Sequence, residues 1–282
     1  MHNIKLSIKP ALGYLAAFSL FVVACQKKFD PNSYKPAESF GGYASSDQIE
    51  SGSLVAHFSF ENNLVDSVSN TAATNYGTTF TPGVKGQALQ VGLNNYAIFK
   101  ATAGLTSLQS MTLAFWFNTT QDTLGTQGMV SFVDSNGFWG NLDFFLDQQT
   151  SSGAVFHIHT IGSGSAGTGG IFLTSWPLQS WGVWTHVALT FDAGSDIFTF
   201  YVNGTEVGSA TVANFGSLNF TNFPAVVLGT SQFETTPSET SGATSQSWAS
   251  YLLGEMDELR VYNKALSASE IRALYQLENL GQ

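Results

Sequence analysis

Six aromatic side chains lie where the sequence predicts loops or the edges of loops, and they are the first candidates for binding chemistry. They are Phe138, Trp139, Trp176, Trp181, Trp248 and Tyr251. Sugars bind by stacking their apolar ring faces on exposed aromatic rings, while polar groups bind their hydroxyls. An aromatic side chain in a loop costs solubility unless it packs or binds something. Each of the six is therefore a candidate ligand contact, and packing beneath its loop is the competing interpretation.

Three histidines form a second candidate group. His157 and His159 are two residues apart on one predicted strand, so they share a face, and His186 lies on another strand. Three imidazoles can hold a zinc ion that activates water. We favour a structural role, because His186 also belongs to a strand pattern described below.

The composition excludes several classes of function. With 43% hydrophobic and 11% charged residues, the chain is too apolar for disorder and too polar for a multispan membrane protein. A net charge of −10 repels phosphate backbones and excludes nucleic acid, whereas carboxylates suit calcium. The single cysteine, Cys25, excludes an internal disulfide. Nucleophile-elbow, P-loop and dinucleotide motifs are absent from the sequence.

The elements that must position these residues are mostly strands. From Leu54 the pattern has period two, with Leu54, Ala56, Phe58 and Phe60 on one face. We predict further strands at 87–91, 95–99, 111–118, 128–133, 142–147, 154–160, 184–191, 196–202, 205–212, 225–229 and 252–262. Turn pairs such as Asn203-Gly204 separate them. Many short strands at this spacing predict a β-sandwich and not alternating βα units.

One helix is predicted at 267–278. Ser267 can cap it, and Glu270 three residues later completes a capping box. Ile271, Leu274 and Leu277 form its apolar stripe, so we expect it to pack against one end of the sandwich.

The first 25 residues resemble a bacterial lipoprotein signal. Lys5 and Lys9 precede the apolar run 11–23, which is too short to span a bilayer comfortably. Small residues before Cys25 resemble a lipobox, which implies cleavage before this residue and its acylation. An ordinary signal peptide with a chance cysteine is the alternative. The start of the next segment, 26–30, loosely resembles the surface-export signal of Bacteroidetes lipoproteins, so we expect an outer-membrane protein that faces the cell surface.

The sequence divides into three parts. Residues 1–24 are the predicted signal peptide, 25–52 the lipidated cysteine and a flexible tether, and 53–282 the folded domain. The tether is predicted because 26–52 are rich in Ser, Gly, Pro and Asp and lack periodicity.

Several segments resemble, in chain order, the laminin-G-like jelly rolls of the concanavalin A-like superfamily. They are the first strand and its acidic turn (54–67), GVKGQAL (83–89), MTLAFWF (111–117), WTHVALTFD (184–192), FYVNG (200–204) and GEMDELRVYNKALS (254–267). The resemblance covers roughly residues 53–277. It implies an all-β, two-sheet antiparallel jelly-roll sandwich with one short C-terminal helix. It says less about function, because this fold carries lectins, adhesins, glycosidases and structural modules.

The resemblance also implies where calcium would bind. In this family a metal often ties the turn after the first strand to the closing strand, which here suggests Glu61, Asn63, Asp66 and Asp257. A second possibility follows from the pentraxins, in which a loop matching 230–251 carries calcium ligands. The corresponding candidates are Asp134, Asn136, Glu234 and Glu239. In both cases a solvated turn without metal is the alternative.

Catalysis is the least favoured interpretation. Glycosidases of this superfamily place an E-x-D-x-(x)-E run on one strand. Here Glu255, Asp257 and Glu258 imitate its beginning, but Arg260 stands where a further carboxylate would be needed. We therefore predict a non-catalytic carbohydrate-binding or adhesion module on a cell-surface lipoprotein, with a glycan or a surface protein as partner. A glycoside hydrolase and a protein-interaction subunit of a surface complex are the alternatives.

Overall fold

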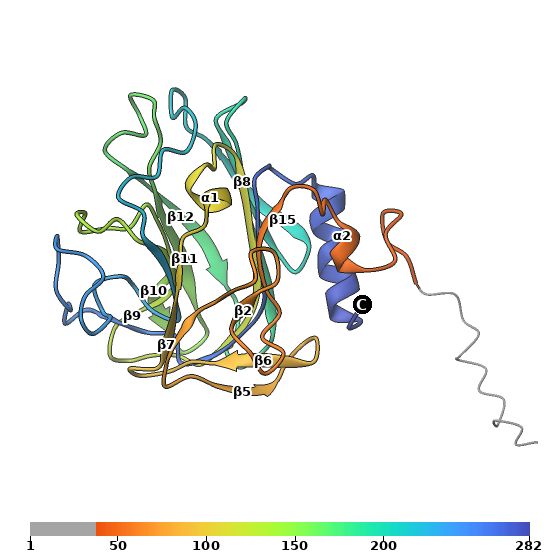
Figure 1. The fold of residues 1–282 in the computed structure, drawn as a ribbon, viewed down its shortest axis with the longest axis horizontal. Helices are drawn as coiled ribbons and strands as arrows, with labels where there is room; N and C mark the ends of the chain where they lie inside the picture. Colours follow the sequence, from red (N-terminus) through yellow and green to blue (C-terminus); the bar gives the residue numbers. More distant parts are fainter. Residues whose placement is uncertain (1–37) are drawn as a thin grey trace, which may run out of the picture. The chain divides into compact units, whose positions relative to one another are not determined.

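Two β-sheets form the body of the molecule in a computed structural model that describes residues 38–282 (Figure 1). The first sheet has the order β15-β14-β13-β8-β18-β6-β5, and β1 pairs with β18. Its strands are β1 (Leu54–Phe58), β5 (Thr79–Pro82), β6 (Gln87–Gln90), β8 (Met111–Thr119), β13 (Thr185–Asp192), β14 (Ile197–Val202), β15 (Thr205–Thr211) and β18 (Gly254–Tyr262).

The second sheet has the order β12-β11-β10-β9-β16-β7-β4. Beyond the end of β16, β17 pairs with β9 in parallel, and every other pairing is antiparallel. Its strands are β4 (Thr74–Tyr76), β7 (Tyr96–Lys100), β9 (Thr126–Phe132), β10 (Leu142–Thr150), β11 (Gly153–Thr160), β12 (Ile171–Leu178), β16 (Ala225–Leu228) and β17 (Ala249–Tyr251). The remaining elements are a small hairpin and three helices: β2 (Val65–Asp66), β3 (Thr71–Ala72), η2 (Ser46–Gln48), α1 (Ala103–Thr106) and α2 (Ala268–Asn279).

The core lies between the two sheets because the period-two pattern turns alternate side chains inward. Phe115 and Phe117 of β8 meet Phe144 and Phe156 of the facing sheet, with ring centroids 5.3–5.9 Å apart. These pairs are edge-to-face, the arrangement that aromatic quadrupoles favour. The aromatic core therefore fixes how the two sheets stack.

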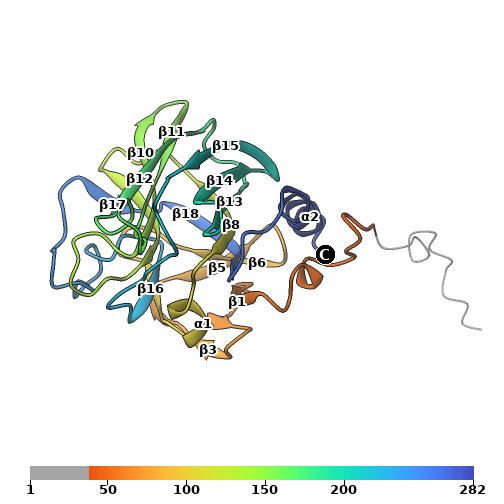
Figure 2. The ribbon, with the colours of Figure 1, turned by 90° about the horizontal axis from the view of Figure 1, so that it is seen from above.

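The outer faces of the two sheets are covered differently. Helix α2 covers the first sheet, where Ile271, Leu274 and Leu277 pack with Tyr262 in a second apolar cluster. Figures 1 and 2 place α2 on the opposite side of the sandwich from β9, β10 and β11. The long connection from β16 to β17 lies on the second sheet, where Tyr251 closes a third cluster with Tyr96. The second sheet is thus covered by loops, which can carry a site.

The predicted fold class is confirmed, including the capped C-terminal helix, whose Ser267–Glu270 capping box is present. Two predictions need correction. Strands β2, β3, β4, β5, β12 and β17 are absent from the predicted set. The longest of them, β12, contains Pro177, whose missing N–H is tolerated because β12 is an edge strand. Residues 38–52 belong to the folded unit and not to a tether, since Ser46 and Ile49 are buried. The predicted signal peptide, Cys25 and residues 26–37 lie outside the described residues.

Candidate functional site

Three of the six predicted aromatic side chains come together on the outer side of the second sheet. We call Phe138, Trp139 and Trp248 the aromatic platform. The ring of Trp248 stacks near Phe138 at 6.4 Å and lies 5.8 Å from Trp139. Phe138 is 37% exposed and Trp248 is 41% exposed. Large aromatic rings that gather at the surface with this much exposure are typical of a binding site.

Two loops far apart in the sequence build this platform. Phe138 and Trp139 lie between β9 and β10, whereas Trp248 immediately precedes β17. The buried side chain of Gln232 joins the loops: its Oε1 accepts from the Asp134 N–H at 2.8 Å, and its Nε2 donates to the Phe138 carbonyl at 3.1 Å. A side-chain amide from one loop can satisfy both an N–H and a carbonyl of the other loop because it both donates and accepts.

The position of Trp248 is also fixed by its backbone. The Thr126 N–H donates to the Trp248 carbonyl at 2.8 Å, at the start of the parallel pairing between β9 and β17. A Cβ on Gly125 would lie 2.5 Å from this same carbonyl oxygen, so only glycine lets the segment before β9 approach the segment before β17 so closely. The ring is therefore held on a rigid strand end.

The platform rests on buried and half-buried aromatic residues. Trp139 stacks on Phe145 of β10 at 5.6 Å, with the planes 8° apart, and the buried Phe233 lies 5.7 Å from Trp248. Phe172 of β12 meets Trp139 edge-on at 5.2 Å and is itself 48% exposed. Phe172 was not among the predicted aromatic candidates, because no strand was predicted at β12.

The other three predicted aromatics are structural. Trp176 stacks on Phe200 at 4.8 Å inside the core, and the ring of Trp181 packs at the core edge with its Nε1 donating to the Thr150 carbonyl at 2.8 Å. Tyr251 is buried, and its hydroxyl donates to the Glu234 carbonyl at 2.6 Å. For these three, the structure favours packing over ligand contact, because Trp176 and Tyr251 are buried and Trp181 is half-buried with its N–H already bonded.

The two loops that carry the pentraxin-like calcium candidates adjoin one another, but their acidic side chains form hydrogen bonds within the loops themselves. Asp134 Oδ1 accepts from the Asn136 N–H at 3.0 Å. The Glu234 carboxylate accepts from the Ser245 hydroxyl at 2.8 Å and from the Gln246 N–H. Glu239 is half-buried, and burial raises the pKa of its carboxyl. These contacts hold the loops beneath the platform in place.

Two members of the other predicted calcium set shape their own turn. Asn63 Oδ1 accepts from the Val65 N–H at 2.9 Å. Asp66 is buried; its Oδ1 accepts from the N–H groups of His57 and Val68, and its Oδ2 from the N–H and hydroxyl of Ser69. This is the usual work of Asn and Asp in turns.

Glu61 and Asp257 both reach the turn at 83–87. The Asp257 Oδ2 accepts from the Val84 N–H at 2.8 Å and the Lys85 N–H at 3.1 Å, while the Glu61 carboxylate accepts from the Gln87 N–H at 3.2 Å. Burial raises the pKa of Asp257 to about 7. A cation here would have to displace these N–H donors, so the residues as they stand do not fit the calcium site that the sequence suggested.

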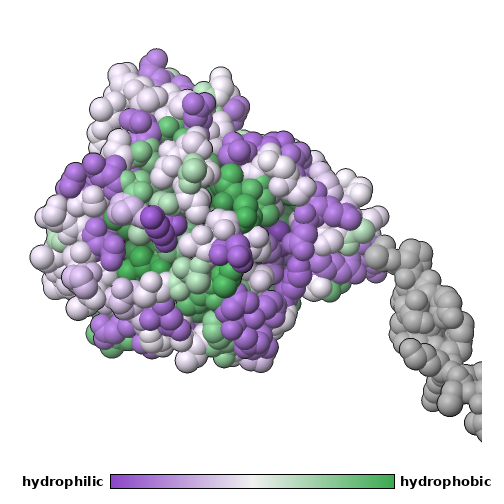
Figure 3. All heavy atoms as spheres, viewed as in Figure 1, coloured by the Kyte–Doolittle hydropathy of each residue, from purple (hydrophilic) through white to green (hydrophobic). Residues whose placement is uncertain are grey.

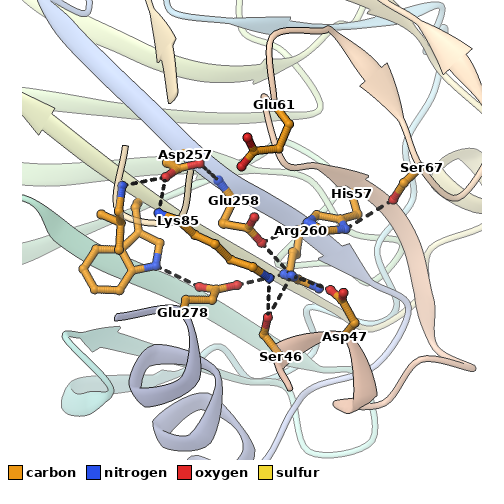
Figure 4. A network of polar contacts seen from close by, with 12 residues as sticks. Ser46, Asp47, His57, Glu61, Ser67, Lys85, Asp257, Glu258, Arg260 and Glu278 are labelled. Atoms are coloured by element: carbon orange, nitrogen blue, oxygen red, sulfur yellow. Dashed lines mark hydrogen bonds and ion pairs between the residues drawn. The ribbon is translucent and has the colours of Figure 1, made fainter. Parts of the chain in front are cut away.

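The closing strand β18 carries a buried ionic network (Figure 4). Glu258 stands at a left-handed φ of 46°, where its Oε2 accepts from Arg260 Nη2 at 2.6 Å and lies 3.0 Å from His57 Nε2. Arg260 Nε also donates to Glu278 of α2 at 2.8 Å, and Trp116 Nε1 donates to the same carboxylate. Asp257 and Glu258 are both buried and their carboxylates already accept from N–H and guanidinium donors, which disfavours the glycosidase interpretation.

The histidines do not form a metal site. His157 and His159 share the outer face of the second sheet, as predicted, and His159 Nδ1 lies 3.0 Å from the Gly140 carbonyl. His186 is buried beneath α2 on the other sheet, 5.2 Å from the ring of Trp116, and burial lowers its pKa to about 3. Between Glu38 and Gln282, no cluster of three or more His, Cys, Asp or Glu residues is arranged to hold a metal ion.

A two-sheet jelly roll with an exposed aromatic platform on its loops defines a lectin-like β-sandwich. The chain belongs to the laminin-G-like family described as the concanavalin A-like lectin/glucanases superfamily, whose model matches residues 91–272, more than half of the chain. The family resemblance inferred from the sequence is thereby confirmed. No curated protein matches the chain.

Solved structures share the fold. Domain 4 of AbnA, a GH43 extracellular arabinanase from Geobacillus stearothermophilus in complex with arabinotriose, is 24% identical, with a TM-score of 0.54 over 79% of this chain and 98% of that domain. The binding domain of Paraclostridial Mosquitocidal Protein 1 is 16% identical, with a TM-score of 0.57 over 79% of this chain and 52% of that one. The binding domain of botulinum neurotoxin DC in complex with SialylT is 13% identical, with a TM-score of 0.57 over 83% and 52%. The chain spans about half the length of these toxin domains.

The helices of residues 38–282 include none that is long and apolar enough to cross a membrane.

Proposed function

We propose that this protein is a non-catalytic carbohydrate-binding module and that the aromatic platform is its binding surface. The observation that carries the proposal is the joint exposure of Phe138 and Trp248, whose rings are held by two loops and supported by Trp139. Sugar rings present apolar C–H faces of matching size, and stacking on fixed aromatic rings loses little side-chain entropy.

The mixed character of the molecular surface and the solved structures of the same fold support the same proposal. Apolar patches on the face seen in Figure 3 are interrupted by polar residues, and a mixed surface of this kind suits a ligand that carries both C–H faces and hydroxyls. Solved structures of the same fold include a complex with arabinotriose and one with SialylT, which supports a glycan as ligand.

A glycan array followed by isothermal titration calorimetry tests the proposal. The wild-type chain, a Phe138→Ala/Trp248→Ala double variant and a Val207→Ala control are compared, in calcium and in EDTA. Val207 is 44% exposed on the edge strand of the other sheet, so it matches Trp248 in exposure but not in location. We expect the wild type and the control to bind the same glycans and the double variant to lose them. Absence of binding to every glycan in both buffers would refute the proposal.

The same samples test the proposal that the module has no glycosidase activity. Bound oligosaccharide is incubated with the protein, and new reducing ends are measured. We expect none above the buffer rate, because the carboxylates Asp257 and Glu258 of the catalytic-looking run are buried in the fold. Release of reducing ends that disappears in a carboxylate variant would show a glycosidase instead.

We also propose that the module is displayed on the outer membrane as a lipoprotein anchored through Cys25. The support is the position of the single cysteine after an apolar signal-like segment. Metabolic labelling with a fatty-acid analogue tests the anchor: wild type should be labelled, and Cys25→Ser should not. Protease treatment of intact cells tests the orientation, and protection of the module in intact but not in lysed cells would contradict surface display. If the array is negative while the platform variant loses a co-purifying membrane protein, the partner is a protein.

A further inference from the structure

A polar hollow of about 540 Å³ opens beside the platform. Trp248 forms one wall, and the remaining walls come from the loop before β9 and from the end of β10. The amide and carboxylate side chains that line it are those of Gln121, Asp122, Asp147, Gln148 and Gln149. Its lining is thus rich in amide and carboxylate groups, which accept hydrogen bonds from hydroxyls.

Asp122 has an unused acceptor in this lining. The residue is only 4% exposed, and its Oδ1 accepts from the Leu124 N–H at 2.7 Å. Its Oδ2 is buried and has no hydrogen-bond partner within residues 38–282. A buried carboxylate oxygen without a donor is unfavourable, so a hydroxyl donor from a ligand would stabilise it. The backbone at Asp122 is held in place, because its N–H donates to Gln149 Oε1 at 2.8 Å.

Gln148 connects this hollow to a second one. It stands at a φ of 49° in the stretch of β10 where the register with β11 shifts, a bulge that turns its side chain away from the regular strand direction. A left-handed conformation is uncommon for glutamine, and residues held in such conformations are enriched at binding and active sites. Gln148 also lines the second hollow, of about 480 Å³, together with Thr150, Ser152, Val155 and Gln179 among others.

The acidic residues of the two hollows favour neutral glycans over anionic ones. Asp122 and Asp147 are the charged residues of the two linings, and neither lining contains Lys or Arg. The nearest imidazole, His157, lies 3.8 Å from Asp147, and burial lowers its pKa. A glycan that carries carboxylates or sulfates would meet only like charge here, whereas neutral hydroxyls find acceptors.

We propose that the hollow beside Trp248 and the hollow beyond Gln148 are consecutive subsites for a linear, uncharged oligosaccharide. In this arrangement Asp122 Oδ2 accepts a hydroxyl hydrogen from the sugar next to the one stacked on Trp248, and Gln148 contacts the chain where it passes between the hollows. The inference rests on the proposed glycan-binding function and adds to it the class of glycan and the direction in which the chain extends.

Calorimetry with neutral arabino-, xylo- and cello-oligosaccharides of two to six units tests the proposal in EDTA. Oligogalacturonides of equal length serve as the charged probe. We expect affinity to rise with length for a neutral series and the charged series to bind at least about tenfold more weakly. Asp122→Asn keeps the size and the acceptor for Leu124 but puts a donor in place of Oδ2, so it should weaken binding about tenfold or more. Gln148→Ala should weaken the six-unit ligand and leave the two-unit ligand unchanged.

Asp192→Asn is the matched control, because Asp192 also accepts from the N–H two residues later, in a turn outside both hollows. The inference is overturned if neutral ligands bind through Trp248 but Asp122→Asn and Gln148→Ala bind like wild type, or if length adds nothing. Tighter binding of oligogalacturonides would also overturn it, as would binding that requires calcium, since the partner of Asp122 would then be a cation. Failure of every neutral and charged glycan to bind would instead refute the proposed function itself.

Discussion

Removal of the Trp248 ring is the most direct perturbation of the proposed site. An aromatic side chain buries about 150–250 Å² when fully covered. Since Trp248 is 41% exposed, a sugar that covers the free part removes roughly 60–100 Å² from water. At about 25 cal/mol per Å² this is worth roughly 1.5–2.5 kcal/mol, which predicts a rise in Kd of about 10- to 70-fold for Trp248→Ala.

Isothermal titration calorimetry with the tightest glycan from the array measures this change at constant salt and pH. Trp248→Phe should keep most of the affinity because a stacking ring remains, and Val207→Ala should bind like wild type. The alanine variant loses its contacts with Phe138 and Phe233, so its fold is checked by urea unfolding before titration. A folded Trp248→Ala protein with a Kd within about twofold of wild type would refute the stacking role, because the expected loss is at least tenfold.

Three further predictions concern the scaffold and the metal. Glu278→Ala should lower the free energy of unfolding by about 3–5 kcal/mol in urea, because it leaves the buried Arg260 Nε and Trp116 Nε1 without their acceptor. Glu206→Ala on the exposed edge should change the free energy little, and a loss below about 1 kcal/mol for Glu278→Ala would contradict the network. Burial lowers the pKa of His186 from 6.5 to about 3, so unfolding takes up a proton and stability is lost as the pH falls from about 6.5 towards 3. His186→Phe should flatten this part of a pH series of urea midpoints, and an unchanged slope would show that other groups cause it. Addition of calcium after EDTA should leave the melting temperature unchanged, because N–H donors already contact Asp257, and a clear rise would show that a cation binds nonetheless.

The network around Arg260 explains how the first sheet serves the site without forming it. Arg260 joins β18 to α2 through Glu278 and to the segment before β1 through Asp47, at 2.8 and 2.9 Å. Removing one partner of such a buried pair is costly, whereas the pair itself adds little. Its contribution is to hold the helix on the sheet face opposite the platform, which leaves the loops of the second sheet free to bind.

The sequence predicted most of the strands because burial on a sheet imposes a period-two pattern that is local. Leu54–Phe58 and Thr185–Asp192 are examples in which the predicted and observed strands agree within two residues at either end. It missed Ile171–Leu178 because Pro177 signals a break in a central strand but is tolerated at an edge, and edge position is a property of the assembled sheet. Phe172 was missed for the same reason.

The exposure of the aromatic candidates could not be predicted from the local sequence. Composition and spacing identified the rings but could not tell which would be exposed, since Trp176 is covered by Phe200 and Tyr251 by the loop that bears Glu234. Asp122 gave no signal at all, because an unpaired carboxylate oxygen becomes visible only when every neighbouring donor is placed.

The sequence by itself determined the sandwich, its family and the signal-like segment that ends at Cys25, because these depend on periodicity and on short motifs along the chain. Tertiary structure alone decided that Phe138 and Trp248, 110 residues apart, form one surface. The physical reason is that the pairing of β9 with β16 brings Gln232 next to the 134–140 loop, and no local pattern specifies that contact.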